Sequence, residues 1–211
     1  FYNSQGYRNA VIVRDSMYVI NDKRIGIDIQ IEEGDKFYIR NVSWVGNSQY
    51  STELLQAMLG IEKGDTYDKK TLHKRLGIGR ETDIEDMSQI SSLYQNNGYL
   101  MSVIEPSEIV VGKDSIDLEI KVFEGRPFTI NNVEISGNQR VDDEVIRREI
   151  YTRPGELYNR ALLMQTLRQL SQMQHFDPAS IMPQIQPVSN DLVDIGWPLV
   201  ESASAKFEIS G

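Results

Sequence analysis

The stretch EGDKFYIRNVSWVGN at residues 33–47 returns as EGRPFTINNVEISGN at residues 124–138. The spacing between matching positions is 91 residues, and it stays constant as far as the pair Leu76 and Leu167. Between residues 33 and 76 the two copies are identical at 13 positions. Self-similarity at a fixed spacing is typical of repeated structural units. The sequence therefore predicts two copies of one fold.

Each copy has the pattern of a strand, two helices and two further strands. Alternating apolar and polar side chains predict the strands, and Asp142 and Asn159 are suitable N-caps for the two helices of the second copy. The elements expected there are a strand at 128–136 with a bulge near Asn131-Asn132, helices at 142–151 and after 159, and strands at 181–187 and 192–201. The order β-α-α-β-β predicts an α+β fold, in which two helices cover a three-stranded mixed sheet.

The first copy repeats this pattern with an insertion, and the N-terminus repeats its second half. The expected elements are a strand at 38–45, a helix capped by Ser51, further helix at 68–76 and roughly 83–97, and strands at 102–111 and 115–124. About 14 extra residues around 77–90 predict a loop with a helix extension. Gly6-Tyr7 and the apolar alternation up to Glu33-Gly34 parallel Gly98-Tyr99 and the strands that follow it. Residues 1–34 are therefore expected to close a third copy.

Composition excludes several classes of function. The net charge is −9, so a phosphate backbone would be repelled, and nucleic acid is not an expected partner. The chain has no cysteine, which excludes disulfides and thiolate metal sites. No apolar run approaches the roughly 18 residues of a membrane-spanning helix.

The histidines give no sign of catalysis. His73 and His175 are the only two, and neither belongs to a metal-binding or nucleophile motif. We therefore expect a protein that is not an enzyme and that holds no cofactor and no metal.

Several short motifs recur in the same order. They are the closing Glu-Gly, the strand end Val-x-x-x-Gly-Asn at 42–47 and 133–138, Gly-x-x-Tyr at 64–67 and 155–158, and Tyr-x-x-x-Gly-Tyr at 94–99. This ordered set resembles the POTRA (polypeptide-transport-associated) domains of the BamA outer-membrane assembly family, and the resemblance covers essentially the whole chain. It implies the end of one POTRA domain at residues 1–34, complete domains at 35–125 and 126–201, and a barrel strand or disordered tail at 202–211.

The resemblance also implies a function. Such domains form an arm on the periplasmic face of the outer membrane of Gram-negative bacteria and lead into a membrane β-barrel. The expected partners are unfolded outer-membrane proteins and accessory outer-membrane lipoproteins, and the membrane is reached through a C-terminal barrel outside these residues. We expect a role in assembling and inserting outer-membrane proteins.

Two surfaces are candidates for binding. A client chain can add a strand to an open sheet edge through backbone hydrogen bonds, and the run 9–20 is long and free of proline. Its candidate residues are Ala10, Val11, Ile12, Val13, Arg14 and Asp15. The alternative is that this run packs a core and that its charges protect the edge. A mixed-charge helix bearing Arg147, Arg148 and Glu149 is the candidate for docking a lipoprotein, with an ordinary solvated face as the alternative.

Other members of the same class remain open. A TamA-like factor or a two-partner secretion transporter would also carry POTRA domains, although the latter usually has two, and a third partial copy argues against it. A cell-division or adhesion scaffold is the rival from another class. Residues 206–211 resemble the start of a barrel strand and argue against a scaffold.

Overall fold

The computed structural model describes residues 1–79 and 86–202. The described chain forms two compact units. The first contains Phe1–Ser91 and Val103–Phe123, and the second contains Ser92–Ser102 and the residues from Glu124 onward. No helix in these residues has both the length and the apolar character that crossing a membrane requires.

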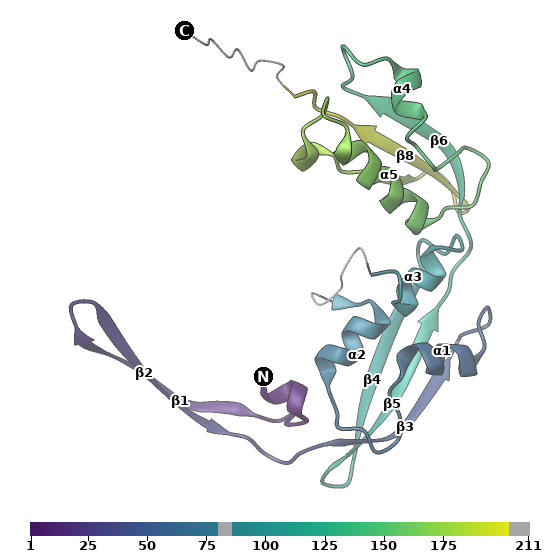
Figure 1. Cartoon of the computed structure of the whole chain (residues 1–211). Coiled ribbons are helices and arrows are strands. Elements are labelled where there is room, and N and C mark those ends of the chain that lie inside the picture. Colours follow the sequence, from purple (N-terminus) through teal and green to yellow (C-terminus); the bar gives the residue numbers. More distant parts are fainter. Residues whose placement is uncertain (80–85, 203–211) are drawn as a thin grey trace. The chain divides into compact units, whose positions relative to one another are not determined.

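Each unit has a three-stranded mixed sheet with helices on one face (Figure 1). In the first, β5 (Ser115–Phe123) is central, with β3 (Tyr38–Val45) parallel to it and β4 (Val103–Val111) antiparallel. In the second, β8 (Leu192–Pro198) is central, with β6 (Thr129–Ser136) parallel and β7 (Gln184–Pro187) antiparallel. The predicted fold is confirmed.

The bulge expected near Asn131 is also present. The register of β6 against β8 shifts between Ile130 and Asn132, and β3 shifts at the matching place between Ile39 and Asn41. A bulge re-aims the side chains that follow it, so the alternation of apolar residues changes parity there. This explains why Val133 is buried although it breaks the alternation.

Two helices of the first unit begin after capping residues, of which Ser51 was the expected one. α1 (Thr52–Leu59) follows Ser51, whose hydroxyl accepts from the Leu54 N–H, and α2 (Lys69–Leu76) follows Asp68, whose carboxylate accepts from two backbone N–H groups. Such caps satisfy N–H groups that have no partner inside the helix. The apolar faces of both helices lie against the sheet and bury Leu55, Leu59, Leu72 and Leu76.

The core of the second unit contains a fully buried tryptophan. α5 (Arg160–Gln172) is capped by the Asn159 side chain and buries Leu163 and Leu170. Trp197 of β8 is completely buried at the centre of this core. A short η3 (Pro178–Ser180) precedes β7.

Several expected boundaries are wrong. α3 covers only Ile90–Gln95 instead of 83–97, and residues 80–85 of the insertion lie outside the described residues. β7 begins at Gln184 rather than at 181, and β8 ends at Pro198 rather than at 201, because proline has no N–H to continue a ladder. The expected barrel strand at 206–211 also lies outside the described residues.

The N-terminal part is a two-stranded hairpin preceded by one helical turn. η1 (Tyr2–Gln5) leads to β1 (Val11–Asn21), which pairs antiparallel with β2 (Arg24–Glu32). Figure 1 shows no helix over this hairpin, and all eleven residues of β1 are exposed. Among the described residues no helix packs over β1, and both alternatives for this run, client binding and packing of a core, stay predictions.

Candidate binding surfaces

The candidate client-binding residues lie at the start of β1. Ala10 precedes the strand, and Val11 to Asp15 form its first half. Among the described residues β1 pairs only with β2, so its other edge has no strand partner. The geometry is that of an open edge with exposed backbone groups.

A bulge interrupts this edge at Val13. The register passes from Ile12, which pairs with Ile31, to Arg14, which pairs with Gln30, so Val13 has no partner position on β2. Bulges at sheet edges are one way in which proteins limit uncontrolled pairing. The edge of β1 is therefore long enough to pair with an added strand, and a bulge interrupts its regular geometry near its N-terminal end.

The apolar face of the hairpin matches a buried face elsewhere in the chain. Ile25, Ile27 and Ile29 of β2 are more than half exposed. At an offset of 91 residues these positions correspond to Ile116, Leu118 and Ile120 of β5, which are buried under α1 and α2. The same strand pattern is thus a core face in one place and an uncovered face in the other.

The candidate docking helix is shorter than expected. α4 covers Asp143–Arg147, so Arg148 and Glu149 lie in the turn after it. The turn tightens because the N–H groups of Glu149 and Ile150 donate to carbonyls three residues back rather than four. Arg147 is half exposed and pairs with Asp143, its neighbour one turn earlier, at 2.6 Å. The charged surface exists, but a turn carries two of its three residues.

A polar cluster in the first unit was not foreseen from the sequence. The Arg8 Nε lies 2.8 Å from the Glu108 Oε2, and the buried Tyr67 hydroxyl donates to the other oxygen of Glu108 at 2.5 Å. Burial raises the pKa of Glu108, but the hydrogen bonds from Tyr67 and Arg8 outweigh it and leave that pKa below its usual value. Burial, followed by the bond to Glu108, raises the pKa of Tyr67. The recurrence of Tyr67 as Tyr158 was the only available signal.

The closing glutamate of the second unit also has a structural role that the sequence did not show. The Glu201 Oε1 accepts from the N–H groups of Gln139, Arg140 and Val141, and Oε2 pairs with the Arg140 Nε at 2.8 Å. The bonds from Arg140, with those from its backbone neighbours, lower the pKa of Glu201 to about 2. This carboxylate fastens the end of the unit to the turn after β6.

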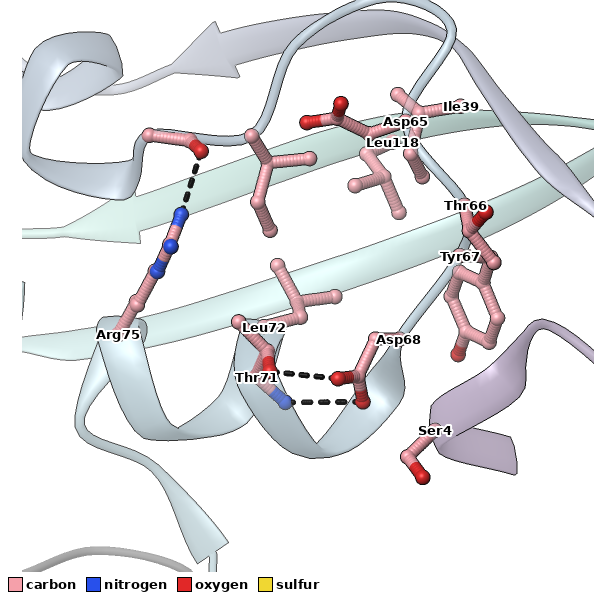
Figure 2. A pocket seen from close by; sticks show the side chains of 12 residues that line it. Ser4, Ile39, Asp65, Thr66, Tyr67, Asp68, Thr71, Leu72, Arg75 and Leu118 are labelled. Carbon is pink, nitrogen blue, oxygen red and sulfur yellow. Dashed lines mark hydrogen bonds between the residues drawn. The ribbon is translucent and has the colours of Figure 1, made fainter. Parts of the chain in front are cut away.

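The best-formed cavity lies in the first unit and has about 280 Å³ (Figure 2). Asp68 and Thr71 face it but bond to one another, and the guanidinium of Arg75 is bound to the carbonyls of Leu59 and Gly60. Ser4 of η1 stands at its rim. Asp68, Thr71 and Arg75 hold helix ends, and these groups do not form a nucleophile–base set.

The described residues contain no cluster of three or more metal-ligating side chains. His73 lies in α2, and His175 follows α5. The arrangement presents edges, apolar faces and charged turns, which are features of a binding protein.

These features define a class of protein built from successive β-α-α-β-β units around mixed sheets. The sequence profile of the POTRA family, described as surface antigen variable number repeat, matches residues 37–125 and 128–195. The chain belongs to this family.

The relatives and solved structures indicate a BamA-type POTRA region. A putative outer membrane protein assembly factor of Treponema pallidum is 24% identical over 99% of the chain, and outer membrane protein assembly factor BamA of Neisseria meningitidis is 23% identical over all of it. The chain spans about a quarter of the length of each, 24% and 25%.

The fold itself matches crystallised POTRA domains. POTRA3-5 of Haemophilus influenzae BamA superposes with a TM-score of 0.72 at 21% identity, covering 95% of this chain and 76% of that one. Haemophilus ducreyi BamA lacking POTRA domains 1–3 gives 0.65 at 18% identity, covering 79% of this chain and 30% of that one.

Proposed function

We propose that this chain is part of the periplasmic arm of an outer-membrane protein assembly factor, without enzymatic activity. It binds unfolded barrel proteins by strand addition and docks accessory lipoproteins. The observation that carries the proposal is the unpaired edge of β1 in a chain that otherwise consists of POTRA repeats. The relatives named as assembly factors support the same role.

Strand addition suits a factor that must accept many clients. A client strand bonds through its backbone, which all sequences share, so an edge can bind it without reading its side chains. β1 has eleven residues without proline, whereas β4 is interrupted by Pro106 and β7 has four residues. Among the described edge strands, β1 is therefore the longest, and it contains no proline.

The test is a titration with a barrel-strand peptide, followed residue by residue in the amide spectrum. We expect shifts along residues 11–20 and none from a peptide that is N-methylated on alternate residues, since methylation removes its donors. Val13→Pro should weaken binding by about fivefold or more, because proline blocks an added strand while the bulge spares the ladder with β2. Val13→Ala is the matched control. Shifts confined to the helices would contradict strand addition.

Residues 1–34 are proposed to close another POTRA unit of the same protein. The support is that Ile25, Ile27 and Ile29 occupy the positions that β5 fills with core residues. A parallel strand and two helices would cover this face, as β3, α1 and α2 cover β5.

The charged surface at Arg147, Arg148 and Glu149 is proposed to dock an accessory lipoprotein. Opposite charges arranged on an exposed helix end and turn give specificity and speed association. Glu149→Lys should reduce capture of the lipoprotein, whereas Glu134→Lys on the exposed side of β6 should not. Equal capture by both variants would count against this surface.

A further inference from the structure

Two glycines occupy the same structural position in the two units. The N–H of Phe37 donates to the carbonyl of Gly6 at 2.9 Å, and the N–H of Phe128 donates to the carbonyl of Gly98 at 2.8 Å. Both glycines have positive φ, 94° and 91°. We call these contacts the Gly6 joint and the Gly98 joint. Each holds the end of one helical turn against the first strand of the following repeat.

The tyrosines on either side of the two glycines also match. The Tyr7 N–H donates to the Tyr2 carbonyl at 3.1 Å, and the Tyr99 N–H donates to the Tyr94 carbonyl at 3.1 Å. The ring centroids of each tyrosine pair lie 6.2 and 6.1 Å apart in edge-to-face geometry. The backbone of the joint is therefore a repeated element of the fold.

The side chains after the glycines differ in a correlated way. Arg8 follows Gly6 by two positions, and Leu100 follows Gly98 by two. Arg8 reaches Glu108 on β4, with an exposed fraction of 35% for its own side chain and 14% for that of Glu108. Leu100 is half-buried and packs against the apolar core that includes Tyr158.

The acceptor of Arg8 has an apolar counterpart in the second unit. Val42 and Val133 are equivalent positions, 91 residues apart, on the first strands of the two sheets. Following the paired positions across each sheet from these residues leads to the equivalent positions on the two edge strands. The two series of paired positions are Val42, Leu118 and Glu108 in the first sheet and Val133, Ile195 and Ile185 in the second. Glu108 and Ile185 thus occupy the same place on the edge strand, and Tyr67 and Tyr158 lie 91 residues apart.

We propose that each unit carries a receiving surface specific for the segment that precedes it, and that the residue two positions after the joint glycine must match the edge-strand residue of that surface. The partner is the preceding segment of the same protein. At the Gly6 joint the match is the ion pair of Arg8 with Glu108, and at the Gly98 joint the corresponding positions hold the apolar residues Leu100 and Ile185. This matching favours docking of each segment on the unit that follows it in the chain.

The physical reason is the cost of a mismatch. A leucine at position 8 would leave the partly buried carboxylate of Glu108 without its cation, and an arginine at position 100 would replace apolar packing against the core with a charge that has no carboxylate at position 185. Specificity arises because wrong pairings are penalised, not only because right ones are favoured. The backbone hydrogen bond that both joints share attaches the preceding segment, and the side-chain pair determines which segment is accepted.

Amide exchange of the whole chain, read separately at Phe37 and Phe128, tests this. Arg8→Glu and Glu108→Arg should each accelerate exchange at Phe37 by about tenfold, and the double variant should return it to within about threefold of the parent. Arg14→Glu, the same change at an exposed arginine of β1, is the control and should have no effect. High salt should accelerate Phe37 and leave Phe128 unchanged.

A transplant tests whether the two matches are interchangeable. Leu100→Arg and Ile185→Glu should each accelerate Phe128, while the pair together restores protection and makes it salt-dependent. The proposal is overturned if single variants leave their joint unchanged, or if either double variant exchanges as fast as its faster single. It is also overturned if Phe37 and Phe128 respond equally to every variant, because that would indicate a loss of global stability.

Discussion

The N–H of Phe128 donates to the carbonyl of Gly98 at 2.8 Å, and the glycine holds a φ of 91° to present that carbonyl. An added Cβ at Gly98 would lie 3.1 Å from the Cβ of Pro127 and 3.4 Å from a methyl of Leu157. Both the backbone angle and the close approach therefore require glycine at this position.

Gly98→Ala should lower the free energy of unfolding of the second unit by about 1–3 kcal/mol, because strain at positive φ adds to crowding. Gly155→Ala is the matched control in the same unit, since Gly155 has a φ of 87° and nothing within 4 Å of an added Cβ. Chemical denaturation should show the larger loss for Gly98. Equal losses would mean that only the backbone angle matters.

Arg160 should contribute more to the stability of the second unit than Arg168, an exposed arginine of the same helix. Arg160 is buried in α5, and its guanidinium donates to Gln95 at 2.9 Å and to Ser92 at 3.3 Å. Arg160→Leu should destabilise the second unit by about 1–3 kcal/mol, because the hydrogen bonds of a buried guanidinium are lost. Arg168→Leu on the exposed side of α5 should stay within about 0.5 kcal/mol. Thermal unfolding of the two variants makes the comparison.

Glu201 should make the stability of the second unit depend on pH in the acid range. Its pKa is lowered to about 2 from the ordinary value of 4.5. The stabilisation is therefore present above about pH 4.5 and is lost as the pH falls towards 2. Glu201→Gln should be less stable than the parent at neutral pH, and the difference should shrink on acidification. A difference that stays constant from pH 7 to pH 2 would contradict this assignment.

Equivalent positions on β5 and β2 should respond differently to truncation. Leu118→Ala should cost about 2–5 kcal/mol because it leaves a cavity in a closed core. Ile27→Ala should stay within about 0.5 kcal/mol in this chain, since Ile27 is exposed. If residues 1–34 close another unit, the same Ile27 change in the full-length protein should cost as much as the Leu118 change.

The sequence by itself determined the architecture. The 91-residue spacing, the alternation of Ile116, Leu118 and Ile120, and the cap at Ser51 are local or periodic features, so they could be recognised without coordinates. It did not determine where helices end. The first helix of the second unit stops at Arg147, where hydrogen bonds tighten into a turn, and no strong stop residue marks that position.

Only the tertiary structure decided which distant residues meet. Arg8 and Glu108 are separated by 100 positions, and Glu201 lies about 60 positions from the turn that it fastens. Their pairing depends on the register of strands in a folded sheet, which no local pattern encodes. The tertiary structure likewise showed that α1 and α2 cover Ile116, Leu118 and Ile120 of β5, because burial depends on what packs over a strand and not on the strand's own sequence.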